Sequence, residues 1–136
     1  MHSSLIRENA FDLLRTYVHV HDGGEIVPID APESFWSDVA SGAYPQLSQG
    51  RLMSAFTFSE PWATWERHPV GAELVVLLSG SVILVLDILD GERLIELTSV
   101  GSYAIVPAGI WHTARTSVET TMLFLTLGAG TEHRPA

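Results

Sequence analysis

The sequence predicts an all-β domain preceded by one or two short helices. Hydrophobic residues make up 46% of the chain and charged residues 17%, a composition typical of globular proteins. After Gly50 the chain is a series of short β-prone runs, each closed by a turn rich in Gly, Pro, Asp or Ser. Such a series indicates an antiparallel sandwich or barrel. At 136 residues the chain is long enough for one domain with one core.

Two helices are expected before this β-rich part. Apolar residues recur at helical spacing over residues 4 to 17 and predict an amphipathic helix there, with Ile6, Ala10, Leu13, Leu14 and Tyr17 on one face. The segment "DAPESFWSDVASG" predicts a second, short helix, with Pro32 in its first turn and Gly42 closing it.

Eight strands are expected from Gly50 onward. Their runs are "RLMSAFTFS", "TWERH", "ELVVLL", "SVILVLDIL", "RLIEL", "SYAIV", "WHTAR" and "TTMLFLTL". Asp90-Gly91 between the fourth and fifth runs predicts a hairpin, because Asp-Gly suits a turn that needs positive φ. The expected organisation is one domain, with a helix and strand extension over 1–49 packed on the core, the core itself over 50–127, and a C-terminal tail over 128–136.

Charge and composition narrow the classes of partner and location. The formal net charge of −9 argues against nucleic acid or an anionic membrane as partner, because both need a basic surface. The absence of cysteine excludes disulfides and thiolate sites. Charged residues interrupt the N-terminal segment where a signal peptide needs an apolar core, and no apolar run reaches the length of a membrane span. We therefore expect a soluble, cytoplasmic protein.

Two glutamates and a histidine lie at the edge of the most apolar part of the chain, in "WERHPVGAELVVLLSG". Side chains alternate along a strand, so Glu66 and His68 share one face. Glu73 opens the next strand and faces the same way as Val75, and a turn at Pro69 would bring it back beside His68. Carboxylates are seldom buried unless they are paired or bind a metal, so this stretch predicts a site.

A second segment, "GSYAIVPAGIWH", adds a fourth candidate. Pro107 and Gly109 predict a turn, and His112 follows it directly. Imidazoles and carboxylates that share one face, with open positions beside them, form the kind of site that holds non-haem Fe(II).

These two patterns resemble the two sequence motifs of the cupin family. In the first, a histidine pair is followed by three or four residues, Glu, six residues and Gly, and the chain matches with His68, Glu73 and Gly80. The second runs Gly, five residues, Pro-x-Gly, two residues and His, and "GSYAIVPAGIWH" fits it at every spacing. The chain departs from the family twice, with Glu66 at the first histidine of the pair and Thr116 at a usual asparagine.

The resemblance covers roughly residues 50 to 127, and it implies a single-domain jelly-roll β-barrel that holds a divalent metal ion. It assigns His68, Glu73 and His112 as metal ligands, with Glu66 as a candidate fourth. The family pattern does not fix the ion, which could be Fe, Mn, Ni or Zn. A second carboxylate favours Fe(II) or Mn(II), and zinc also accepts this donor set.

Two alternatives stay open at this stage. The glutamates could pair with the histidines in a barrel without metal, and Glu66 could be either a ligand or a free catalytic base. "HVHD" supplies another pair, His19 and His21, but no glutamate follows it at matching spacing, so an exposed edge strand or a dimer contact is expected there. His133 lies near the terminus, where disorder is the default expectation, and the alternative is that it folds over the barrel mouth of its own or a neighbouring subunit.

Strand parity also suggests which residues line a substrate pocket. Trp62 and Thr64 share the face of Glu66, so both are pocket candidates. Met53 and Tyr103 are further candidates, although the facing of their strands is not fixed by the sequence. Four residues near the site lie off this parity and are expected to face away from the metal: Trp65, Arg67, Trp111 and Arg115.

The resemblance implies an enzyme of the Fe(II) dioxygenase class, acting on a small organic molecule. A metal-dependent isomerase or lyase is the alternative, with Glu66 as the base, and a non-catalytic ligand-binding cupin is the third candidate. The family often forms homodimers, which we expect here by analogy.

Overall fold

The computed structural model describes residues 5–127 and 130–136 and shows eleven strands and two short helical segments. In the N-terminal part, the elements are β1 (Thr16–Val20), β2 (Ile26–Asp30), the helix α1 (Phe35–Ala40) and a 3₁₀ turn η1 (Pro45–Ser48). The remaining strands are β3 (Arg51–Phe58), β4 (Thr64–Arg67), β5 (Glu73–Ser79), β6 (Val82–Ile88), β7 (Gly91–Leu97), β8 (Tyr103–Val106), β9 (His112–Arg115), β10 (Thr120–Leu127) and β11 (Glu132–Pro135). The eight strands expected from Gly50 onward are β3 to β10, so that prediction is confirmed.

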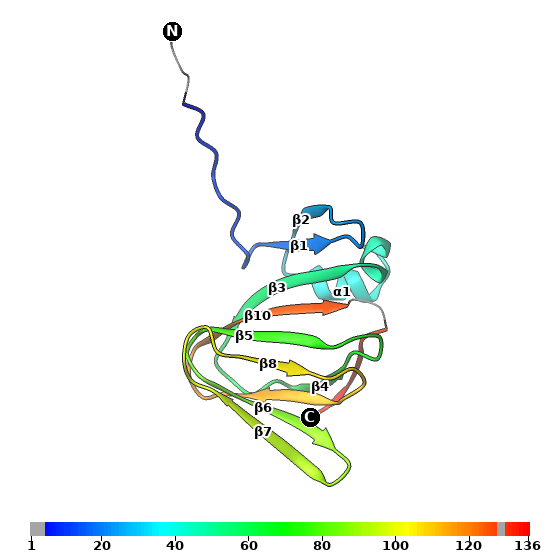
Figure 1. Ribbon diagram of the computed structural model, residues 1–136, viewed down its shortest axis with the longest axis vertical. Coiled ribbons are helices and arrows are strands. Elements are labelled where there is room, and N and C mark those ends of the chain that lie inside the picture. The colour runs from blue at the N-terminus through cyan, green and yellow to red at the C-terminus, as the bar shows by residue number, and fades with distance from the viewer. Residues whose placement is uncertain (1–4, 128–129) are drawn as a thin grey trace.

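The strands form two antiparallel sheets (Figure 1). One sheet has six strands in the order β2-β1-β3-β10-β5-β8, and the other has five in the order β11-β4-β9-β6-β7. The predicted all-β class is therefore confirmed, while closure of the two sheets into a barrel stays a prediction. The β6–β7 hairpin turns at Leu89 and Asp90, and Gly91 takes the positive φ of 128°.

The helix predicted over 4–17 is wrong for the residues described. Residues 5 to 12 have no regular structure, 13 to 15 form a turn, and β1 begins at Thr16, whereas residue 4 lies outside the described residues. Figure 1 shows this segment leading away from both sheets. Ile6 and Leu14 are 84% and 45% exposed, so the part of the apolar face before β1 is largely uncovered. A short helix without tertiary packing is marginal in water, which explains the failure.

The second predicted helix is present but shorter than expected. It begins after Ser34 rather than around Pro32, and Gly42 follows its C-terminal end with a positive φ of 87°. Phe35 is its one fully buried residue and packs edge-on against Tyr17 of β1 at 5.0 Å between ring centroids. This small cluster, which includes Leu47 and Leu52, joins the N-terminal elements to β3.

The "HVHD" segment is not at a sheet edge, which corrects the sequence-based expectation. Strand β1 pairs with both β2 and β3, so it lies inside the six-stranded sheet. His19 is only 2% exposed, and its Nε2 lies 2.7 Å from the carbonyl oxygen of Gln49. His19 therefore acts as a buried, hydrogen-bonded core residue.

The main core lies between the two sheets. The strands β5, β6 and β10 supply most of its residues, with further contributions from β7, β8 and β9. Along β5 every second residue is buried, beginning with Glu73 and continuing through Val75 and Leu77. The same alternation that builds the core therefore places the carboxylate of Glu73 inside it.

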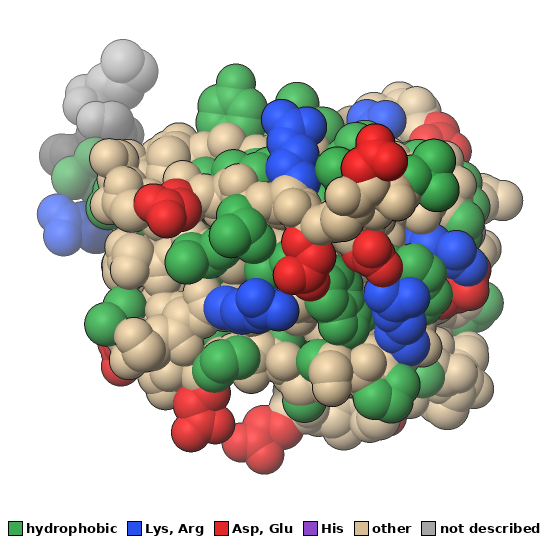
Figure 2. Space-filling view, turned by 90° about the horizontal axis from the view of Figure 1, so that it is seen from below, with side chains coloured by type: hydrophobic (Ala, Val, Ile, Leu, Met, Phe, Trp, Pro, Cys, Tyr) green, Lys and Arg blue, Asp and Glu red, His purple; other side chains and the backbone are tan. Residues whose placement is uncertain are grey.

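No helix in the described ranges has the length and hydropathy needed to cross a membrane. On the face shown in Figure 2, basic and acidic side chains lie among one another, without a broad patch of one sign. Two ion pairs of the described residues join Arg67 to Glu132 at 2.8 Å and Arg134 to Asp87 at 2.7 Å.

Candidate metal centre

Two backbone contacts bring the distant sequence motifs together. Glu66 of β4 is paired in register with His112 at the start of β9. The N–H of Gly109, in the turn before β9, donates to the carbonyl oxygen of His68 at 3.0 Å. The second motif therefore folds directly against the end of the first.

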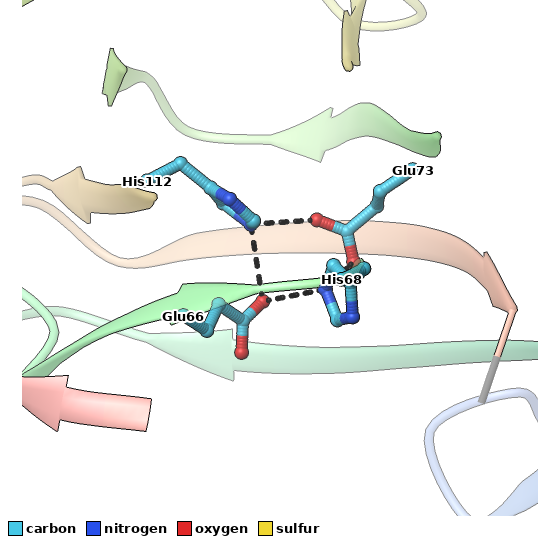
Figure 3. A group of neighbouring side chains, drawn as sticks. All are labelled: Glu66, His68, Glu73 and His112. Carbon is cyan, nitrogen blue, oxygen red and sulfur yellow. Dashed lines mark hydrogen bonds and ion pairs between the residues drawn. The ribbon is translucent and has the colours of Figure 1, made fainter. Parts of the chain in front are cut away.

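Four side chains converge at this point. Glu66 and His68 come from β4 and the residue after it, Glu73 from β5 and His112 from β9, and they point toward one another (Figure 3). One ligand atom from each lies within 4.8 Å of those of the other three. His112, Glu73 and His68 are 1%, 2% and 7% exposed. The structure therefore brings together all four residues proposed as metal ligands from the sequence.

The donor atoms alternate around the cluster. His112 Nε2 lies 3.0 Å from Glu73 Oε1 and 3.3 Å from Glu66 Oε1. His68 Nε2 lies 3.2 Å from Glu73 Oε2 and 3.4 Å from Glu66 Oε1. Each imidazole nitrogen is thus placed between two carboxylates, and each carboxylate between two imidazoles.

The outer ring nitrogens fix which atoms face the centre. His112 Nδ1 lies 3.0 Å from the carbonyl oxygen of Ile110, which can only accept, so this nitrogen carries a proton. His68 Nδ1 lies 2.9 Å from the hydroxyl of Thr131. A neutral His112 therefore presents the lone pair of Nε2 to the glutamates. A metal-binding histidine is typically held by an outer partner in this way.

The carboxylates strongly change the proton affinities of the histidines. Burial by itself lowers the pKa of His112, but hydrogen bonds and charge from Glu66 and Glu73 outweigh it and raise that pKa to about 10. The same opposing effects raise the pKa of His68 to about 9. Burial raises the pKa of Glu66, but hydrogen bonds from His112, His133 and His68 outweigh it and leave that pKa well below its ordinary range. The cluster therefore requires positive charge, from protons or from a cation.

The geometry fits a cation. An ion about 2.1 Å from each donor holds neighbouring donors roughly 3.0 to 3.4 Å apart in octahedral or tetrahedral geometry. The four imidazole–carboxylate distances lie between 3.0 and 3.4 Å. In addition, the buried Nε2 of His68 has no well-aligned hydrogen bond. The cluster can therefore hold one divalent ion.

A cavity of about 550 Å³ opens beside the cluster. Its wall includes Trp62 and Thr64 together with Glu66, as strand parity suggested. Met53 and Tyr103, the two other pocket candidates, do not line it. Tyr103 is 62% exposed on β8, and the cavity wall takes the neighbours of Met53 on β3 instead. Both residues lie outside the wall for the same reason, because their strands present the alternate residues inward.

The C-terminal segment contributes to the site, which the sequence patterns did not favour. Strand β11 pairs with β4, which places His133 opposite Glu66. His133 Nε2 lies 3.6 Å from Glu66 Oε2, and Thr131 contacts His68. The expectation of disorder around His133 is wrong. The charged and aromatic residues of "EHRP" and β4 were the available signal for a contact between these segments. The pattern within one strand does not show, however, which other strand it pairs with.

Comparisons with known proteins support the fold. Neither a sequence-family description nor a curated protein sequence matches the chain. Among solved structures, a variant of Bacillus subtilis oxalate decarboxylase is 14% identical over 69% of this chain and 26% of that chain, with a TM-score of 0.52. A cupin-2 domain protein from Shewanella frigidimarina is 14% identical over 63% of this chain and 71% of that chain, with a TM-score of 0.48.

Peruvianin-I, a cysteine peptidase from Thevetia peruviana latex, is 16% identical over 63% of this chain and 56% of that chain, with a TM-score of 0.53. This chain contains no cysteine, so a thiol-based activity does not carry over. It spans about a quarter of the decarboxylase and about half of Peruvianin-I. Over the aligned part the chain shares the fold of the decarboxylase variant and of Peruvianin-I, which agrees with the resemblance of its two motifs at the level of the fold alone. At these identities the likeness carries no activity over.

Proposed function

We propose that the protein is a divalent-metal-binding cupin that acts as an enzyme on a small organic molecule, with a dioxygenase as the first candidate. The observation that carries the proposal is the set of four donors within 4.8 Å of one another. Two imidazoles and carboxylates facing a cavity form a donor set suited to Fe(II) or Mn(II). The metal would supply the redox chemistry that activates O2.

The surrounding residues fit this role. In a dioxygenase both atoms of O2 enter the product and the substrate supplies the electrons, so no external reductant is required. Glu66 is the least buried of the four, with a side chain 19% exposed, and it lies in the cavity wall. Its Oε1 faces both imidazoles while Oε2 faces His133. The buried side of the site excludes bulk water, and the cavity side leaves room for a substrate.

The position of Glu66 also favours a second candidate, a metal-dependent isomerase or lyase. A base in such an enzyme must reach the substrate without being fully occupied as a ligand. Glu66 Oε2 meets this condition, because it points away from the two imidazoles and lies at the cavity. In that case Glu66 would move a proton, while His68, Glu73 and His112 would hold the ion.

The first experiment is a metal reconstitution. Protein stripped with a chelator is loaded separately with Fe(II), Mn(II), Ni(II) and Zn(II), and its metal content is measured by elemental analysis. We expect one ion per chain, and no retention of any of the four ions would reject the proposal. Oxygen uptake by Fe(II)-loaded protein, over a panel of small hydroxylated compounds, then separates the candidates. An isomerase or lyase would turn over without O2 and would lose activity in Glu66→Gln.

A further inference from the structure

The part of the cavity wall that the structure describes carries no lysine or arginine side chain. The seven Lys and Arg residues of the chain are all arginines, and all lie in the described ranges. None of them lines the cavity. The charged or chargeable groups in the described wall are Glu66, Glu73, His68 and His133. Three of these belong to the proposed metal cluster, and His133 faces Glu66. An anionic ligand would therefore find no lysine or arginine in the described wall, and His133 already pairs with Glu66.

The metal cluster does not provide surplus positive charge either. Two carboxylates, Glu66 and Glu73, balance the two charges of a divalent ion, and the neutral imidazoles add none. A ligand with two negative charges would bring both into a partly enclosed site whose formal charge is already zero. Burying unpaired charge in this way is costly.

Part of the described cavity wall is aromatic. Phe56 and Phe124 stack with centroids 4.7 Å apart and an interplanar angle of 16°. Trp62 lies 5.8 Å from Phe124 and 6.1 Å from Phe56. All three line the cavity that Glu66 and Glu73 also line. Aromatic walls of this kind bind flat apolar ligands through stacking and burial of area.

From this placement we propose that the cavity takes a flat aromatic molecule, uncharged or singly ionised, with two adjacent oxygen atoms directed at the metal cluster. Small dianions such as oxalate are excluded as preferred ligands. The volume of about 550 Å³ exceeds what a two-carbon ligand needs and suits a ring with substituents. This inference rests on the proposed metal site, and it adds the class of ligand.

The test uses two chelating probes of different charge and shape. Binding of 4-nitrocatechol and of oxalate to Zn(II)-loaded protein is measured by isothermal titration calorimetry near neutral pH, with metal content checked afterwards. We expect 4-nitrocatechol to bind at least about tenfold more tightly, a difference typical of one good aromatic contact. Equal or tighter binding of oxalate overturns the inference.

Matched variants identify the cause. Phe56→Ala should weaken 4-nitrocatechol about tenfold while leaving the metal affinity unchanged, and Tyr103→Ala, on the outer surface, should change neither. Glu66→Gln keeps the shape of the side chain but removes one negative charge. The affinity of this variant for oxalate should therefore rise relative to its affinity for 4-nitrocatechol. If Phe56→Ala binds 4-nitrocatechol like the wild type, the aromatic assignment is wrong.

The two proposals fail in distinguishable ways. Metal retention without a preference for the aromatic probe rejects the ligand class and leaves the metal site intact. If no metal is retained, the proposed function fails. Binding of 4-nitrocatechol to metal-free protein, weakened by Phe56→Ala, would then still support an aromatic cavity.

Discussion

Two pairs of side chains in this chain have the same spacing, and the fold uses them differently. His19 and His21 lie two residues apart at the end of β1, as Glu66 and His68 do at the end of β4. The ring centroids of His19 and His21 lie 4.2 Å apart, and the Nε2 of His19 contacts the backbone carbonyl oxygen of Gln49. Within the described ranges, no further metal-ligating side chains complete a cluster around them.

The pair formed by Glu66 and His68 differs because other strands bring further metal-ligating side chains to it. Glu73 reaches it from β5 in the opposite sheet, and His112 reaches it from β9 beside β4. These partners place carboxylates next to both imidazoles, so the cluster requires a cation or protons. The comparison shows that the i, i+2 spacing alone does not define a metal site. A site forms where neighbouring strands supply complementary donors at the same depth.

The largest expected effect is the loss of metal affinity when a histidine of the proposed cluster is removed. His112→Ala should lower metal affinity by more than about 100-fold, because even the outer partner of a ligand is worth about 10- to 100-fold. His21→Ala is the matched control and should retain one ion per chain. Calorimetric titration with Zn(II) measures both. Equal losses in the two variants would show that the proposed centre does not hold the ion.

The next largest expected effect is the pH dependence of the stability of the metal-free protein. In the metal-free protein the glutamates, acting against burial, raise the pKa of His68 to about 9 and of His112 to about 10, from 6.5. A group whose folded pKa is raised stabilises the fold fully below its unfolded pKa and loses this contribution as pH rises through the folded pKa. The pKa of Glu66 is lowered, so its contribution is present above 4.5 and is lost as pH falls.

We therefore expect the metal-free protein to lose thermal stability between pH 6.5 and about 10. Metal affinity should rise over the same interval, because the ligating nitrogens must lose their protons. Scanning calorimetry of metal-free and Zn(II)-loaded protein measures the first effect, and proton release on binding measures the second. His112→Ala should have a shallower pH dependence, and an unchanged slope would contradict the assigned cause.

Much of this could be predicted from the sequence because it depends on local alternation. The strands from Gly50 onward follow the pattern of apolar residues and turns, and the motif spacing anticipates which four side chains meet. Strand pairing is not local, which is why the role of Thr131 was missed and disorder was favoured for His133. The helix expected over 4–17 failed for the converse reason: an apolar periodicity forms a helix only where a surface covers it, and Ile6 is 84% exposed.

The smallest expected effect concerns the contact that holds His68 in place. The hydroxyl of Thr131 lies 2.9 Å from His68 Nδ1, and Thr131→Val removes it with little change in shape. Metal affinity should fall about tenfold, at the lower end for outer partners of metal ligands. Thr131→Ser should restore it, because the hydroxyl returns, and circular dichroism should be the same for all three proteins. If the valine variant binds Zn(II) as tightly as the wild type, packing alone orients His68. The dependence of this site on the C-terminal segment would then be limited to the pairing of β11 with β4 and the contact of His133 with Glu66.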